Sequence, residues 1–182
     1  MAAAVAAPLA LQRCEIGCAA GAMTTPLTLH PVALDSPGLA ACCSAIAATA
    51  DSTPFGPADA RLELSAGTPR FYVMELQQRS AAAVEKITQH RQVTQCLASA
   101  DGKPFWIALA SPLEDGATIA AARVQLVRVN PGEAIALHRC TWHAGPYFLE
   151  PTARFFNLEL SDTNITDHHT RPLDRPLRLE LR

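Results

Sequence analysis

The sequence predicts an all-β fold, an antiparallel β-sandwich or β-barrel with one short helix near its N-terminal end. Beyond about residue 60, apolar side chains alternate with a period of two, which places successive side chains on opposite faces of a sheet. Turn signals built on Gly, Pro, Asn and Asp interrupt this alternation at short intervals. Many short strands with such punctuation are typical of antiparallel sandwiches and barrels.

The helix is expected first along the chain. Ser36 suits the N-cap, Pro37 suits the first helical position, and we expect the helix to continue from Leu39 to Ala50. The turn-rich segment from Asp51 to Pro57 then ends it.

The strands follow in order. We expect them at residues 61–65, 70–77, 83–87, 94–99, 105–110, 123–129, 134–138 and 154–160. Asp101-Gly102 is a good hairpin turn between two of them. The alternation of Leu177, Leu179 and Leu181 indicates either a terminal strand at a sheet edge or a loose tail.

The chain of 182 residues suits one folded domain, which we place at residues 23–182. Residues 1–22 are rich in Ala, with Arg13 as their one base and Glu15 as their one acid. We interpret them as an N-terminal extension, either a plastid or mitochondrial targeting peptide or a disordered segment. Without such targeting, a cytoplasmic location is expected.

Charge and composition favour a small-molecule partner. The formal net charge of −2 provides no basic field for nucleic acid or an anionic membrane. No apolar run approaches the roughly 20 residues of a spanning helix. The six cysteines do not form the pattern of a disulfide framework, so we expect reduced thiols.

The first group of candidate functional residues lies between Thr88 and Gln95. On an extended strand Thr88 and His90 share a face, and Gln95 follows a short turn later. This resembles the first motif of cupin barrels, in which two histidines and a downstream carboxylate bind a metal. Here Thr88 and Gln95 occupy two of those three positions, which weakens a divalent site. We therefore expect no required metal; a weakly bound one would use His90, Gln95 and His143.

The second group is the run from His138 to Phe148, where two histidines lie five residues apart. If the strand is regular, only one of them faces a barrel interior. Three segments then resemble the ureidoglycolate lyase family, in the order of its motifs: Ile87-Thr88-x-His90-x3-Thr94-Gln95, Thr141-Trp142-His143-Ala144-Gly145-Pro146, and residues 156–164 with the sequence FNLELSDTN. Phe55-Gly56-Pro57 and the segment from Thr68 to Tyr72 are similar to blocks of its plant and algal branch.

The resemblance implies a cupin-like β-barrel or jelly roll, a homodimer, and cleavage of ureidoglycolate to glyoxylate and urea in the breakdown of allantoin, a product of purine degradation. Such cleavage needs a base, an acid and a cation for the carboxylate. We assign proton transfer to His90 and His143, because histidine titrates near neutral pH. Glu159 would orient an imidazole or take a proton itself.

The remaining assignments concern substrate binding. Gln95 would bind the urea amide, and either Arg70 or Arg139 would bind the carboxylate. Trp142 would form a wall of the substrate site or part of the core. We expect His138 to face outward or to pack structurally, and His168-His169 to lie on the surface.

Two alternatives remain open from the sequence. One is a cupin-like binding protein for another small carboxylate or ureide, without turnover. The other is a metal-dependent cupin enzyme of a different reaction class.

Overall fold

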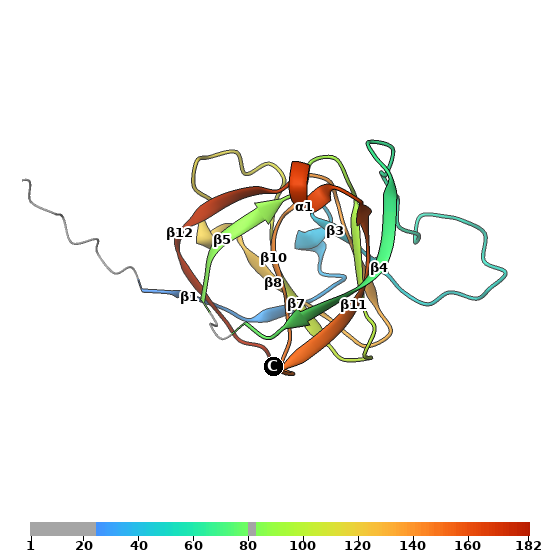
Figure 1. Cartoon of the computed structure of the whole chain (residues 1–182). Helices are drawn as coiled ribbons and strands as arrows, with labels where there is room; N and C mark the ends of the chain where they lie inside the picture. The colour runs from blue at the N-terminus through green and yellow to red at the C-terminus, as the bar shows by residue number, and fades with distance from the viewer. Residues whose placement is uncertain (1–24, 80–82) are drawn as a thin grey trace, which may run out of the picture.

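The computed structural model describes residues 25–79 and 83–182, and its regular structure consists mostly of strands, which form two sheets (Figure 1). The predicted N-terminal extension lies outside the described residues. The seven-stranded sheet contains, in spatial order, β1 (Leu27–Leu29), β12 (His169–Leu179), β5 (Ala83–Gln89), β10 (Trp142–Tyr147), β7 (Phe105–Ala110), β8 (Gln125–Val129) and β2 (Pro31–Ala33). The five-stranded sheet contains β3 (Cys43–Ile46), β9 (Ala134–Leu137), β6 (Gln95–Ser99), β11 (Thr152–Leu160) and β4 (Pro69–Gln77).

The larger sheet curls until it is nearly closed. β1 and β2 occupy its two opposite edges, yet only His30 separates them along the chain. The chain passes from one edge to the other without reversing, and β1 pairs parallel to β12 while β2 pairs parallel to β8. All other strand pairs in the two sheets are antiparallel. The predicted all-β, cupin-like barrel is confirmed, with these two parallel pairs as an addition.

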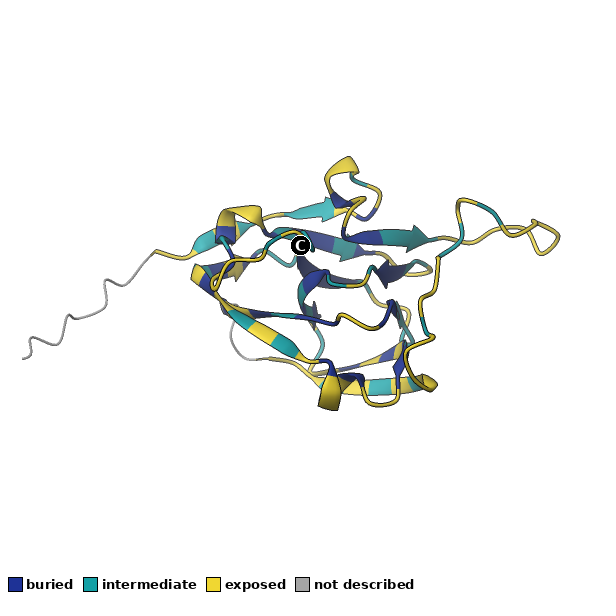
Figure 2. Cartoon of the chain, turned by 90° about the horizontal axis from the view of Figure 1, so that it is seen from above, coloured by how far each residue is buried: buried dark blue, intermediate teal, exposed yellow. Residues whose placement is uncertain are grey.

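The two faces of the larger sheet carry separate hydrophobic cores. One core fills the space toward the five-stranded sheet and includes Phe105, Ile107 and Phe155. The other, on the opposite face, includes Trp106 and Trp142. Exposed residues concentrate in the connections, above all in the long segment between β3 and β4 (Figure 2). No helix among the described residues is long and apolar enough to cross a membrane.

The prediction of a helix that continues to Ala50 is wrong. Only a 3-10 turn, η1 (Pro37–Leu39), forms there, and Ser36 makes no side-chain capping bond. The chain then enters β3, which pairs with β9 and buries Cys43 in the first core. The pairing supplies the hydrogen bonds that a helix would have made, so the tertiary partner overrides the local pattern.

Most predicted strands are confirmed within two residues, but residues 61–65 form no strand. The main chain of Glu63 instead makes two isolated bonds to Thr94: its carbonyl accepts from the Thr94 N–H, and its N–H donates to the Thr94 hydroxyl. The open question about the C-terminal tail is settled in favour of a strand. β12 begins at His169, earlier than the leucine alternation indicates, and lies between β1 and β5.

Candidate active site

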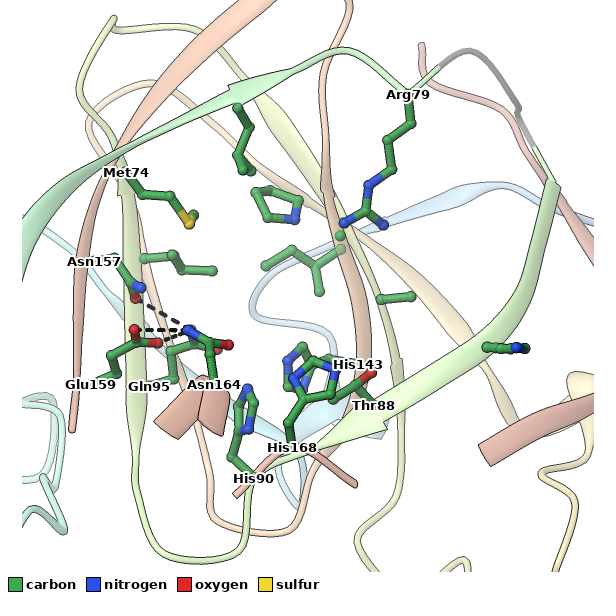
Figure 3. Close-up of a pocket in the computed structure, with 17 residues that line it drawn as sticks. Met74, Arg79, Thr88, His90, Gln95, His143, Asn157, Glu159, Asn164 and His168 are labelled. Atoms are coloured by element: carbon green, nitrogen blue, oxygen red, sulfur yellow. Dashed lines mark hydrogen bonds between the residues drawn. The ribbon is translucent and has the colours of Figure 1, made fainter. Parts of the chain in front are cut away.

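A cavity of about 220 Å³ lies between the two sheets and is lined by side chains from both (Figure 3). β5 and β10 contribute Thr88 and His143, and the opposing sheet contributes Gln95, Asn157 and Glu159. Its volume is below the roughly 300 Å³ at which pockets for drug-sized ligands begin. The cavity therefore suits a metabolite of few heavy atoms.

His90 follows directly after β5, and its imidazole is buried. Its Nδ1 lies 2.5 Å from the main-chain carbonyl oxygen of Asp167. A carbonyl oxygen only accepts, so Nδ1 carries the hydrogen and Nε2 keeps a free lone pair. Burial lowers the pKa of His90. At neutral pH this residue is a neutral imidazole held in one tautomer, a suitable base.

His143 on β10 has the same arrangement. Its Nδ1 lies 3.2 Å from the carbonyl oxygen of Thr141, so Nε2 is again the free nitrogen. Burial lowers its pKa to about 3. The rings of His90 and His143 are 4.9 Å apart between centroids, with their planes at 53°. The structure thus brings these two side chains together in one cavity.

The strand that carries His143 approaches β7 closely because of the glycine that follows. Gly145 has a φ of +132°, and a Cβ there would lie 3.0 Å from the carbonyl oxygen of Trp106. Only glycine accepts this combination without strain. Gly145 and Pro146 both line the cavity, so this part of the motif shapes its wall.

Glu159 on β11 is buried at the other side of the cavity, and polar groups surround its carboxylate. One oxygen accepts from the Tyr72 hydroxyl and from the Asn164 amide, each at 3.1 Å. The other accepts from the Gln95 amide at 3.0 Å. Asn157 completes the cluster, since its amide nitrogen donates to Tyr72 and its amide oxygen lies 3.3 Å from the Gln95 amide nitrogen. Glu159 contacts no imidazole, so its predicted orienting role does not appear.

The cations of the cavity are Arg79 and Lys86, which the sequence did not single out. Arg79 follows β4 and directs its guanidinium into the cavity (Figure 3). Arg70 and Arg139, the predicted carboxylate ligands, lie outside it. Arg70 stacks on the Tyr72 ring with its guanidinium carbon 3.7 Å from the ring centroid, and Arg139 pairs with Glu63 at 2.7 Å.

Trp142 and His138 also lie apart from the cavity. The Trp142 indole is buried in the second core, where its N–H donates to the carbonyl of Glu114 at 2.8 Å. His138 lies 2.8 Å from the Ser44 hydroxyl through its Nε2. Between the two histidines of this run the chain turns at Cys140, which has a φ of 65°, so they do not belong to one strand. Of the two, only His143 lines the cavity.

Several residues that line the cavity were not predicted from the sequence. Asn157 lies two positions before Glu159 on β11, and period-two alternation could have placed both on one face. Asn164 follows in the same motif. The prediction that His168 lies on the surface is confirmed, since its side chain is exposed. Nothing in the polar tail indicated that His168 also lines the cavity, where its ring is 5.7 Å from that of His90.

The residues named as possible metal ligands also have other partners. Among residues 25–79 and 83–182, no group of three or more His, Cys, Asp or Glu side chains is arranged to hold an ion. Gln95, the expected third ligand, directs its amide nitrogen toward Glu159, and Thr88 lies 3.2 Å from the Thr170 hydroxyl.

Comparison with known proteins adds no assignment, since no protein-family model and no curated protein matches this chain.

Proposed function

We propose that this protein is a ureidoglycolate lyase-like enzyme, which cleaves ureidoglycolate to glyoxylate and urea by histidine acid–base chemistry. The observation that carries the proposal is the convergence of His90 and His143 on one small cavity. The same cavity holds a carboxylate–amide cluster and two cations. The ureidoglycolate lyase motifs of the sequence contribute both histidines, Gln95 and Glu159.

The chemical groups of the substrate match the cations and the carboxylate–amide cluster of the cavity. Ureidoglycolate carries a carboxylate, a hydroxyl and a urea group on one carbon. Arg79 and Lys86 supply positive charge for the carboxylate, in place of Arg70 and Arg139. The oxygens of Glu159 and of the Asn157 amide are acceptors suited to urea N–H groups.

His90 is the base of the proposed reaction. Its free Nε2 takes the hydroxyl proton, the oxygen forms a carbonyl with carbon, and the bond from carbon to the urea nitrogen breaks. That nitrogen keeps the bonding electrons and takes up a proton, so the proton lost from oxygen balances the one gained. The reaction needs no oxidant and no metal.

The assay is direct release of glyoxylate and urea from ureidoglycolate by the purified full chain. We expect turnover by the wild-type protein and a fall in kcat of about 10²–10⁴-fold in His90→Gln. His30→Gln is the matched control, because His30 is exposed and does not line the cavity. A wild-type protein that binds glyoxylate but releases none from ureidoglycolate would contradict the proposal and favour a binding protein. Activity that appears only after addition of a divalent metal would favour a metal-dependent enzyme.

We also propose a second copy of the chain as a partner, in agreement with the dimer that the family resemblance implies. The outer face of β4 and β11 exposes Phe71, Val73 and Phe156 at 68%, 53% and 41%. Phe71 and Phe156 stack with centroids 5.9 Å apart. Contiguous exposed apolar side chains of this kind mark association surfaces.

A further inference from the structure

We infer that His168 is a third acid–base residue of the cavity, the one that delivers a proton to the departing urea nitrogen. The inference rests on the proposed function and deepens it, because it replaces His143 as the acid. His168 lies between α1 (Thr163–Thr166) and β12, and its side chain reaches the cavity from a segment distant in sequence from both other histidines.

The position of His168 fits this role. Its imidazole lies beside those of His90 and His143 in Figure 3, and its ring centroid is 5.7 Å from that of His90. Unlike His90, His168 is exposed at the mouth of the cavity. Bulk water can therefore restore a proton to it between turnovers.

The backbone on both sides of His168 is fixed. The buried Asp167 carboxylate accepts from the main-chain N–H groups of Arg91 and Gln92, at 2.8–2.9 Å. His169 enters β12 opposite Gln89 and lies 3.3 Å from Asp167. Because the backbone is already ordered, only the side-chain rotations of His168 remain to be fixed when it acts.

The other two histidines are poor starting acids. An acid must hold its proton before the reaction, and burial lowers the pKa of His90 and takes that of His143 to about 3. Both are neutral at neutral pH. The charged or titratable groups that line the cavity with His168 are His90, His143, Glu159, Arg79 and Lys86, and Asp167 precedes it in the chain.

The proton balance closes with this pair. His90 takes the hydroxyl proton, the carbon–nitrogen bond breaks, and the nitrogen receives the proton of His168. The products leave with His90 protonated and His168 neutral. One proton passing from His90 to His168, directly or through water over the 5.7 Å ring separation, restores the starting state.

The test compares wild-type protein, His168→Gln, His168→Ala and His30→Gln in the glyoxylate-release assay. We expect His168→Gln to lower kcat about 100-fold with KM little changed, and added imidazole to restore part of the kcat of His168→Ala. His30→Gln should match the wild type. Circular dichroism and thermal melting confirm that each variant is folded.

A His168→Gln variant with kcat within about twofold of the wild type would overturn the inference, as would a change confined to KM. Either result leaves the proposed function standing, because wild-type turnover is then established. A wild-type protein that releases no glyoxylate overturns the proposed function and this inference with it.

Discussion

At the scale of single residues, the partly buried imidazole of His143 contributes to how the stability of the fold responds to acid. Its pKa lies at about 3 in the folded protein and at 6.5 when unperturbed. Between these values the unfolded chain binds a proton that the folded chain does not, so this share of the stability is present above pH 6.5 and is lost as the pH falls toward 3. At pH 4 the loss is at most about 3 kcal/mol.

The variant His143→Gln removes that proton uptake. Urea unfolding at pH 7 and pH 4 should therefore show a smaller loss of stability in His143→Gln than in the wild type. His30→Gln should keep the wild-type loss, because His30 is exposed. Equal losses in the wild type and in His143→Gln would contradict this assignment of the pKa shift.

The cations of the cavity provide a second prediction at this scale. Lys86→Gln and Arg79→Gln should each raise KM for ureidoglycolate about 10- to 100-fold with kcat little changed, since a charge-assisted bond contributes about 1.5–3 kcal/mol. Arg70→Gln should behave as the wild type, because Arg70 stacks on Tyr72 outside the cavity. Steady-state kinetics separate KM from kcat. A raised KM in Arg70→Gln alone would restore the assignment made from the sequence.

These residues show which parts of the candidate site could be predicted from the sequence. His90 and Gln95 belong to one motif, and His143 and Glu159 to two later ones. The resemblance predicts one site for these residues, and all four line the same cavity. Arg79 and Lys86 belong to no motif quoted for that resemblance. Arg79 enters the cavity only because of the direction the chain takes after β4, which local pattern does not determine.

At the scale of elements, Asp167 joins the end of β5 to the start of β12. Its carboxylate accepts from Arg91 and Gln92, while its carbonyl lies 2.5 Å from His90 Nδ1. Asp167→Ala leaves both N–H groups without their partner and should lower stability by about 2–3 kcal/mol. It should also lower kcat, because the turn that positions His90 loosens.

The control for this prediction is Asp167→Asn, whose amide oxygen can still accept one of the two bonds. We expect its stability and kcat to lie between those of Asp167→Ala and the wild type. Urea unfolding measures the first quantity, and glyoxylate release measures the second. An Asp167→Ala protein with wild-type stability would show that the turn is held by other contacts.

The elements also differ in how closely their bounds could be predicted from the sequence. β4, β7 and β11 are rich in aromatic residues and have turn residues near their ends, and their predicted bounds lie within two residues of the observed ones. β3 is composed of residues without strong preference, and only its pairing with β9 decides its form. His168 reaches the cavity by the pairing of β12 with β5, a contact between distant segments that no local pattern reveals.

At the scale of the whole molecule, the resemblance predicted a barrel but did not indicate which strands complete its larger sheet. β1 and β2 are each three residues long, too short for a reliable pattern, yet they occupy both edges of the larger sheet. By pairing with β12 and β8 they cover the backbone groups of those two strands, and they leave only three-residue strands at the edges, which offer little backbone to another chain. Association by edge pairing is therefore less favoured than association through a sheet face.

The outer face of β4 and β11 is the surface through which we expect two copies to associate. Phe71→Glu and Phe156→Glu each place a charge among the exposed Phe71, Val73 and Phe156 side chains, and burying that charge in an interface is costly. Light scattering coupled to size exclusion should show a dimer for the wild type and a monomer for either variant. Leu113→Glu is the control, since Leu113 is 85% exposed in the loop after β7 and should leave the dimer intact. A monomeric wild-type protein, or a dimer that survives both substitutions, would exclude this face as the interface.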